Sequence, residues 1–135
     1  ARMGAPKADN KSALSARCDY DLDRTVDSIR PDYKFDATSR GSVPEARIAV
    51  LDADDFEHTL RLAISLGGDA DTQAAIACSV AEAYFGGVPD RIEEEVVVVL
   101  DPPRIGVVAR FLFAASEGNL MAGEEEVTDF RIQNT

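Results

Sequence analysis

Apolar residues recur at three- and four-residue spacing along most of the chain, which is the pattern of amphipathic α-helices. In the clearest case, Phe56, Leu60 and Ala63 follow the 3.6-residue period of one helix face. We therefore expect an all-α fold, a compact multi-helix bundle. The spacing predicts helices over residues 9–17, 21–29, 42–52, 55–66, 72–85 and 104–115.

The segment of residues 89–100 fits two interpretations. Its first part, Asp90 to Glu95, is typical of a helix, whereas the β-branched run from Val96 to Val99 would suit a buried strand. No other segment offers a convincing strand for it to pair with. The prediction for this segment is therefore a helix.

Capping and turn residues mark the expected helix ends. Ser42 is a good N-cap, Pro44 suits a first turn, and Glu45 stands where a capping box needs it. Asp54 or Asp55 is expected to cap the next helix. Glycine pairs after residues 66 and 85 are expected to end two helices, because glycine enters the left-handed conformation without Cβ strain.

The helix predicted from Gln73 to Phe85 is built almost entirely of small and apolar residues. We therefore expect both of its sides to be buried at the centre of the domain. Asp69 and Asp71 at its start would then be buried carboxylates, which need a partner. No Lys or Arg lies nearby in the sequence, so a cation is the simplest partner.

Charge and composition narrow the classes of function. The 135 residues carry a formal net charge of −11, which argues against nucleic acid and against anionic membrane surfaces as partners. No apolar run is long enough to span a membrane. Cys18 and Cys78 are too few for a disulfide framework, so we expect a reduced, cytoplasmic compartment. The helical domain is expected to cover residues 1–118, and residues 119–135 to form an acidic tail.

Two aromatic residues stand in the polar segment of residues 32–41. Tyr33 and Phe35 could be packing anchors, or they could stack on a flat group of a ligand. The pattern leaves both interpretations open.

The candidate chemistry lies between two predicted helices, in the sequence SLGGDADT at residues 65–72. Carboxylate and hydroxyl oxygens gathered at a sharp turn are the ligands of a hard cation such as Mg²⁺. A second interpretation is that Asp69, Asp71 and Thr72 only cap the following helix. A third, a phosphatase-type loop with Asp69 as nucleophile, is rejected because Gln73 stands where that loop needs Thr.

Further segments on both sides of this turn strengthen the metal interpretation. In chain order they are DLDRTVDSIRP at 21–31, GSVPEA at 41–46, AAIA at 74–77 and AEAYFGGVP at 81–89. Together with the turn they resemble the ADP-ribosylglycohydrolase family, all-helical and metal-dependent enzymes of the dinitrogenase-reductase-activating type. The resemblance rests on the order of several segments rather than on one short motif.

The resemblance implies hydrolysis of ADP-ribosyl glycosidic bonds, in which ADP-ribose is removed from modified protein side chains. It implies two Mg²⁺ ions as cofactors, with Mn²⁺ as an alternative. The metal ligands would be Asp69, Asp71 and Thr72, and the two aspartates would be the catalytic residues.

On the substrate side, the resemblance implies roles for Gly67, Gly68 and Ser42. The glycines would let a ligand approach the backbone closely. Ser42 would belong to the region that lines the ADP-ribose pocket. The partner would be ADP-ribose or an ADP-ribosylated protein.

The family's other acidic ligands, a T-D-D type motif and a separate Glu, belong to its N-terminal half and have no counterpart in residues 1–60. The chain is therefore expected to be the C-terminal half of a larger helical enzyme, with the missing N-terminal half as its partner. One alternative is an inactive fragment or remnant that acts as a helical binding module without catalysis. A plain helical interaction domain, whose aspartates only cap a helix, is another.

Overall fold

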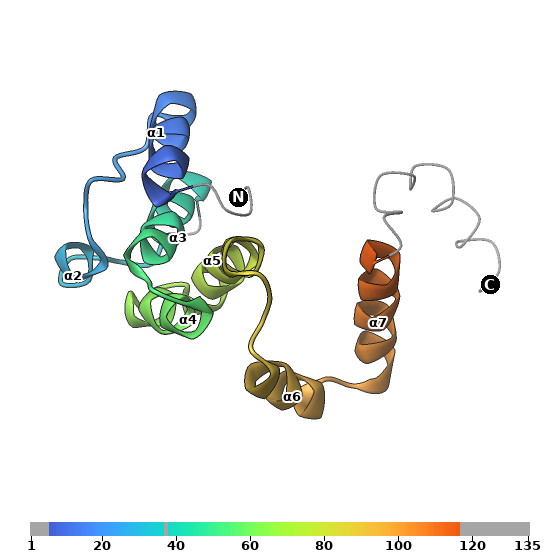
Figure 1. Ribbon diagram of the computed structural model, residues 1–135. Coiled ribbons are helices and arrows are strands. Elements are labelled where there is room, and N and C mark those ends of the chain that lie inside the picture. The colour runs from blue at the N-terminus through green and yellow to red at the C-terminus, as the bar shows by residue number, and fades with distance from the viewer. Residues whose placement is uncertain (1–5, 37, 117–135) are drawn as a thin grey trace. The chain divides into compact units, whose positions relative to one another are not determined.

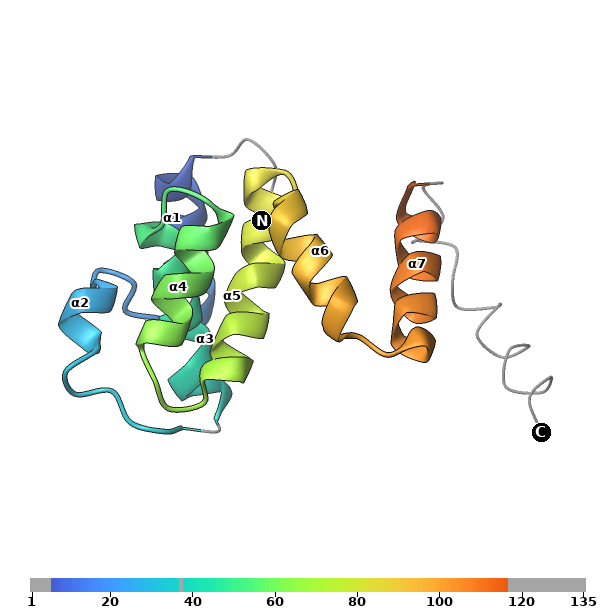
Figure 2. The same ribbon diagram turned by 90° about the horizontal axis from the view of Figure 1, so that it is seen from below.

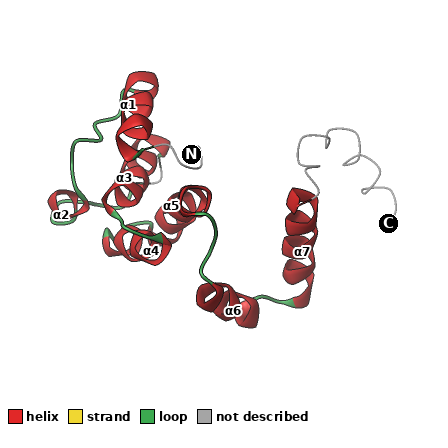
Figure 3. Cartoon of the chain, in the orientation of Figure 1, coloured by secondary structure: helices red, strands yellow, loops and turns green. Residues whose placement is uncertain are grey.

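The computed structural model describes residues 6–36 and 38–116. Over these residues the chain forms helices joined by loops, without a strand (Figure 3), so the all-α prediction is confirmed. The predicted acidic tail, residues 119–135, lies outside the described residues. The helices are α1 (Lys7–Cys18), α2 (Val26–Ile29), α3 (Ser39–Asp52), α4 (Phe56–Ser65), α5 (Ala70–Phe85), α6 (Asp90–Val99) and α7 (Pro102–Ser116).

The chain divides into two compact units, Ala1–Asp90 and Arg91–Thr135. The first unit contains α1 to α5, and the second contains nearly all of α6 together with α7 (Figure 1). Among the described residues, no helix combines the length and the apolar character that a bilayer crossing requires.

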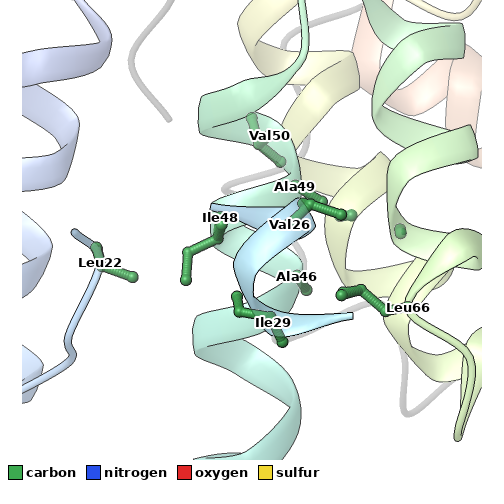
Figure 4. Close-up of a cluster of buried hydrophobic side chains, with 10 residues drawn as sticks. Leu22, Val26, Ile29, Ala46, Ile48, Ala49, Val50 and Leu66 are labelled. Carbon is green, nitrogen blue, oxygen red and sulfur yellow. The ribbon is translucent and has the colours of Figure 1, made fainter. Parts of the chain in front are cut away.

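The core of the first unit lies where α3, α4 and α5 pack on one another and α2 packs on α3 (Figures 1 and 2). Helix α3 supplies its centre, because Ala46, Ile48 and Ala49 are fully buried. Figure 4 shows Val26 and Ile29 of α2 beside these residues of α3. The predicted apolar spacing in α2 therefore marks a face that is buried in the core.

Helix α2 is shorter than predicted. It begins after Thr25, whose hydroxyl accepts the Ser28 N–H at 3.3 Å, while Ser28 Oγ accepts the Thr25 N–H at 3.0 Å. This capping box satisfies N–H groups that have no partner within the helix. Leu22 lies before the helix but is also buried in the core.

Helix α3 begins about one turn before the predicted start. Thr38 rather than Ser42 is the N-cap: the Thr38 hydroxyl accepts the Gly41 N–H at 3.2 Å. Ser42 Oγ instead donates back to the Thr38 carbonyl at 2.8 Å. Pro44 therefore lies inside the helix, and Glu45 takes no part in a capping box. Both Thr38 and Ser42 are good caps, so local pattern could not choose between them.

The end of α3 is held by α1. Lys7 Nζ donates to the carbonyl of Leu51 at 3.0 Å and to the carbonyl of Ala53. A cation at a helix C-terminus satisfies carbonyls that lack an intrahelical partner and interacts favourably with the helix dipole. Leu14 of α1 also packs against the core, so a polar and an apolar contact both dock α1.

The predicted ends of α4 are confirmed. Asp55 is its N-cap and accepts the His58 N–H at 2.7 Å. At the other end the helix stops at the predicted glycine pair, with Leu66 as C-cap. His58 is partly exposed, and its Nδ1 accepts the Asp54 N–H at 3.2 Å.

The prediction that both sides of α5 are buried is wrong. Only one face is buried, through Gln73, Ala77 and Ala81, whereas Ala75 and Ala83 are exposed. Small apolar residues are found at the surface as well as in the interior. Their composition could therefore not show which side of the helix faces the core.

In the second unit, the segment with two interpretations is helical, so the prediction of a helix for α6 is confirmed. Helix α7 begins at Pro102, earlier than predicted, and proline is favourable at a first helical position. The helical spacing of Ile105, Val108, Leu112 and Phe113 predicts a face of α7 that points inward. The relative exposures of Val108, Leu112 and Phe113 are, however, 44%, 46% and 68%. The prediction of a helix is therefore confirmed for α7, whereas the prediction that its apolar face is buried is wrong.

We expect the substitution Ile48→Ala to lower the free energy of unfolding by about 2–5 kcal/mol, because it leaves a cavity in the fully buried centre of α3. The matched control is Ile64→Ala on α4, where the side chain is 50% exposed and the expected loss is about 1 kcal/mol or less. Urea denaturation followed by circular dichroism measures both. Equal losses would contradict the assignment of α3 to the core.

Candidate functional site

The turn between α4 and α5 reverses the chain through two left-handed glycines. Gly67 has φ +76° and Gly68 has φ +63°, a region that strains any residue with a Cβ atom. The Gly67 N–H donates to the Ile64 carbonyl at 3.1 Å and so closes the end of α4. The chain then enters α5 with Asp69 at the N-cap position.

Asp69 does not behave as an ordinary cap. Its side chain makes no capping hydrogen bond to α5, although its main-chain carbonyl accepts the Gln73 N–H at 2.9 Å. The Asp69 carboxyl group lies instead beside that of Asp71. A hydrogen bond with the Asp69 side chain, which forms when one of the two carboxyl groups is protonated, is the main cause that lowers the pKa of the Asp71 carboxyl group. The N–H groups of Thr72 and of Asp71 itself lower it further.

This lowered pKa keeps Asp71 ionised at neutral pH. Because the folded-state pKa lies below the unfolded one, the N–H groups that bond to the Asp71 carboxylate stabilise the fold at neutral pH. Their contribution is lost as the pH falls through the lowered pKa.

The expectation of buried carboxylates is wrong. Asp69 is partly exposed, and Asp71 and Thr72 are exposed. The argument that these carboxylates need a cation because they are buried therefore does not hold. The remaining structural observation is that two acidic side chains lie together at one turn, which suits an oxygen-seeking divalent ion.

The oxygen ligands that these residues could offer are two carboxylates and one hydroxyl. Such a donor set fits Mg²⁺ or Mn²⁺, which prefer oxygen, and Mg²⁺ is often held by only one or two carboxylates together with water. Over residues 6–36 and 38–116, no group of three or more His, Cys, Asp or Glu side chains is arranged to hold a metal ion. Of the candidate ligands, the turn therefore offers two carboxylates and one hydroxyl at most.

The predicted substrate-side residues lie close to this turn or to the start of α3. Gly68 faces Tyr33: a Cβ atom at Gly68 would lie 2.9 Å from Tyr33 Cε1. A Cβ atom at Gly67 would meet nothing within 4 Å. Ser42 is buried, and its hydroxyl is engaged with the Thr38 carbonyl.

A cleft of about 540 Å³ adjoins this region in the first unit. Tyr33 is part of its wall and packs partly against the core, so it serves as the packing anchor foreseen from the sequence. Phe35, in contrast, is 67% exposed. The residues that line the cleft are Arg24, Ser28, Ile29, Asp32, Tyr33, Lys34, Phe35, Asp36, Gly41 and Glu45.

Two polar residues of this region have contacts that the sequence did not predict. Glu45 is buried and pairs with Arg24 at 2.9 Å, but its Oε2 has no hydrogen-bond partner among the described residues. Gln73 is fully buried, and its Nε2 donates to the Tyr33 hydroxyl at 2.5 Å. The burial of Gln73 could have been predicted from its position in the helix, because four-residue spacing places it on the same face of α5 as Ala77 and Ala81.

The comparison with protein families is decisive for the class of protein. The model of the ADP-ribosylglycohydrolase family matches residues 7–119, which is most of the chain. The chain therefore belongs to the ADP-ribosylglycohydrolase family, and the resemblance seen in the sequence is confirmed. Membership supports a glycohydrolase activity in general terms. Searches of curated proteins and of solved structures found no match.

We expect the pKa of Asp71 to be higher in Asp69→Ala than in Asp69→Asn. Both variants remove the charge of Asp69, but only asparagine keeps a donor that can bond to Asp71. A pH titration of the Asp71 carboxyl carbon by NMR measures the difference. Equal pKa values in the two variants would show that the hydrogen bond between the two carboxyl groups is absent.

We expect Gly68→Ala to destabilise the first unit more than Gly67→Ala. Both variants carry the left-handed strain of about 1–2 kcal/mol. Only Gly68→Ala also pushes on the Tyr33 ring, which adds about 1–3 kcal/mol. Urea denaturation of the two variants tests this, and a larger effect at Gly67 would contradict the contact with Tyr33.

Proposed function

We propose that this chain supplies one part of a metal-dependent site that hydrolyses ADP-ribosyl glycosidic bonds and removes ADP-ribose from modified protein side chains. The observation that carries the proposal is the pair of adjacent carboxyl groups of Asp69 and Asp71, on an accessible turn, in a chain of this family. Membership of the family supports the glycosidic chemistry, and the oxygen-bearing side chains of the turn support the proposed metal dependence.

Asp69, Asp71 and Thr72 would hold the cations, two Mg²⁺ ions or Mn²⁺ in their place. When bound, such ions polarise hydroxyl groups and lower the pKa of bound water. Asp71 suits this role because it remains ionised at neutral pH. Gly67 leaves its surroundings open, which would allow a substrate to approach the backbone of the turn.

A pair of ions needs more protein ligands than this turn offers. We propose that the remaining acidic ligands come from an N-terminal half of the same enzyme. ADP-ribose or an ADP-ribosylated protein would bind where the two halves meet the turn. The formal net charge of −11 supports a cation as mediator, because the diphosphate of ADP-ribose would otherwise be repelled.

We expect Asp71→Ala to reduce metal-dependent release of ADP-ribose by at least about 100-fold. The substitution removes several kcal/mol of transition-state stabilisation by the metal, and each loss of about 1.4 kcal/mol lowers the rate tenfold. The assay follows release from an ADP-ribosylated protein with Mg²⁺ or Mn²⁺, using the chain joined to its upstream sequence. The control is Asp54→Ala, which removes a carboxylate that is 91% exposed at the start of α4.

Full activity in Asp71→Ala would contradict a role for the turn in catalysis. Absence of release from the joined protein under any metal would contradict hydrolysis altogether. In that case a helical binding module without catalysis would be the function that agrees with the result.

A further inference from the structure

Gln73 is a polar residue in a place where an apolar one would fit. Its side chain is fully buried on the face of α5 that otherwise presents Ala77 and Ala81. Burying an amide is unfavourable unless its hydrogen bonds are made. The Nε2 group of Gln73 has a hydrogen-bond partner in the Tyr33 hydroxyl, whereas Oε1 has none among the described residues.

The orientation of this amide follows from the hydroxyl group that it meets. Tyr33 has one hydroxyl proton, and it donates that proton to the Gly41 carbonyl at 3.1 Å. The Tyr33 oxygen must therefore accept its second hydrogen bond, and Gln73 Nε2 is the donor, at 2.5 Å. A chain of hydrogen bonds thus runs from Gln73 through Tyr33 to the start of α3.

The same tyrosine touches the candidate metal-binding turn. Its ring would be 2.9 Å from a Cβ atom at Gly68, so the ring packs closely on the bare glycine backbone. Burial, followed by the negative charges of Glu45, Asp36 and Asp69, raises the pKa of Tyr33, while the hydrogen bond from Gln73 lowers it. The carboxyl group of Asp69 is therefore near enough to act on the Tyr33 hydroxyl.

Gln73 is also tied to the turn through the main chain. It directly follows Thr72, and its N–H donates to the carbonyl of Asp69 at 2.9 Å. Tyr33 thus contacts the turn once through Gly68 and once through Gln73, on either side of the two aspartates. Two glycines in the left-handed region would otherwise leave this turn with much conformational freedom.

We propose that Tyr33 and Gln73 are positioning residues, whose hydrogen bond fixes the turn so that Asp69 and Asp71 are held in the geometry that binds a divalent cation. This inference rests on the proposed function, since it takes the turn as the metal-binding element. Residues that orient metal ligands typically change metal affinity by about 10- to 100-fold when they are substituted. A hydrogen bond kept only for stability would be replaced by apolar packing at little cost.

The first part of the test needs no metal. Backbone ¹⁵N relaxation of this chain is measured for wild type, Tyr33→Phe and Gln73→Leu. We expect the order parameters of residues 67–72 to fall from about 0.85 to below about 0.6 in both variants. The matched control is Thr59→Val, which removes another fully buried polar side chain, whose Oγ1 donates to the Asp55 carbonyl at 2.9 Å. We expect the turn of this control to match wild type.

The second part uses the chain joined to its upstream sequence and measures Mn²⁺ affinity from the paramagnetic broadening of the amide signals of the turn. We expect Tyr33→Phe and Gln73→Leu to weaken Mn²⁺ binding by about 10- to 100-fold, and Thr59→Val to leave it unchanged. The double variant is expected to bind Mn²⁺ as weakly as each single variant, because either substitution already removes the shared hydrogen bond.

The outcomes separate this inference from the proposed function. An ordered turn in both single variants, or wild-type Mn²⁺ affinity with a loosened turn, would overturn the positioning role alone. Wild-type protein that binds Mn²⁺ through Asp71 but releases no ADP-ribose would overturn only the proposed hydrolysis. Absence of Asp71-dependent Mn²⁺ binding in wild type would overturn both.

Discussion

The first unit depends on alanine at the points where its helices meet. Ala49 of α3, Ala63 of α4 and Ala77 of α5 are fully buried, and side chains of this size let packed helices lie close together. A larger side chain at such a position would move the helices apart, because protein interiors have little free volume. The position of α5, and with it the start of that helix at Asp69, therefore follows from the packing of α3 and α4.

Much of the fold could be predicted because its signals are local. The glycine pairs end α4 and α5 as expected, and Asp55 caps α4. The start of α3 could not be predicted in this way, because Thr38 and Ser42 are both good N-cap residues and the sequence does not show which of them is used. The burial of α5 was misjudged because small apolar residues occur at the surface as well as in the interior. That of α7 was misjudged because an apolar pattern defines a face of a helix but does not show that anything covers it.

In the candidate site, too, local features could be predicted from the sequence and long-range contacts could not. Asp69 and Asp71 could be found from the sequence because their spacing and their glycine turn are local features. The contact between Tyr33 and Gln73 joins residues 40 positions apart, and the pair of Arg24 with Glu45 joins residues 21 apart. No short motif contains such pairs. The residues that could hold a ligand were predictable, whereas those that hold the turn in place appeared only in the structure.

The attachment of α1 has a consequence for behaviour in acid. Several ion pairs of the described chain, such as Lys11 with Asp23 and Arg61 with Glu57, weaken once their carboxylates are protonated. Lys7 donates instead to main-chain carbonyls of Leu51 and Ala53, which do not titrate. The tether between α1 and the end of α3 therefore keeps its acceptors at low pH, where the ion pairs of Lys11 with Asp23 and of Arg61 with Glu57 weaken.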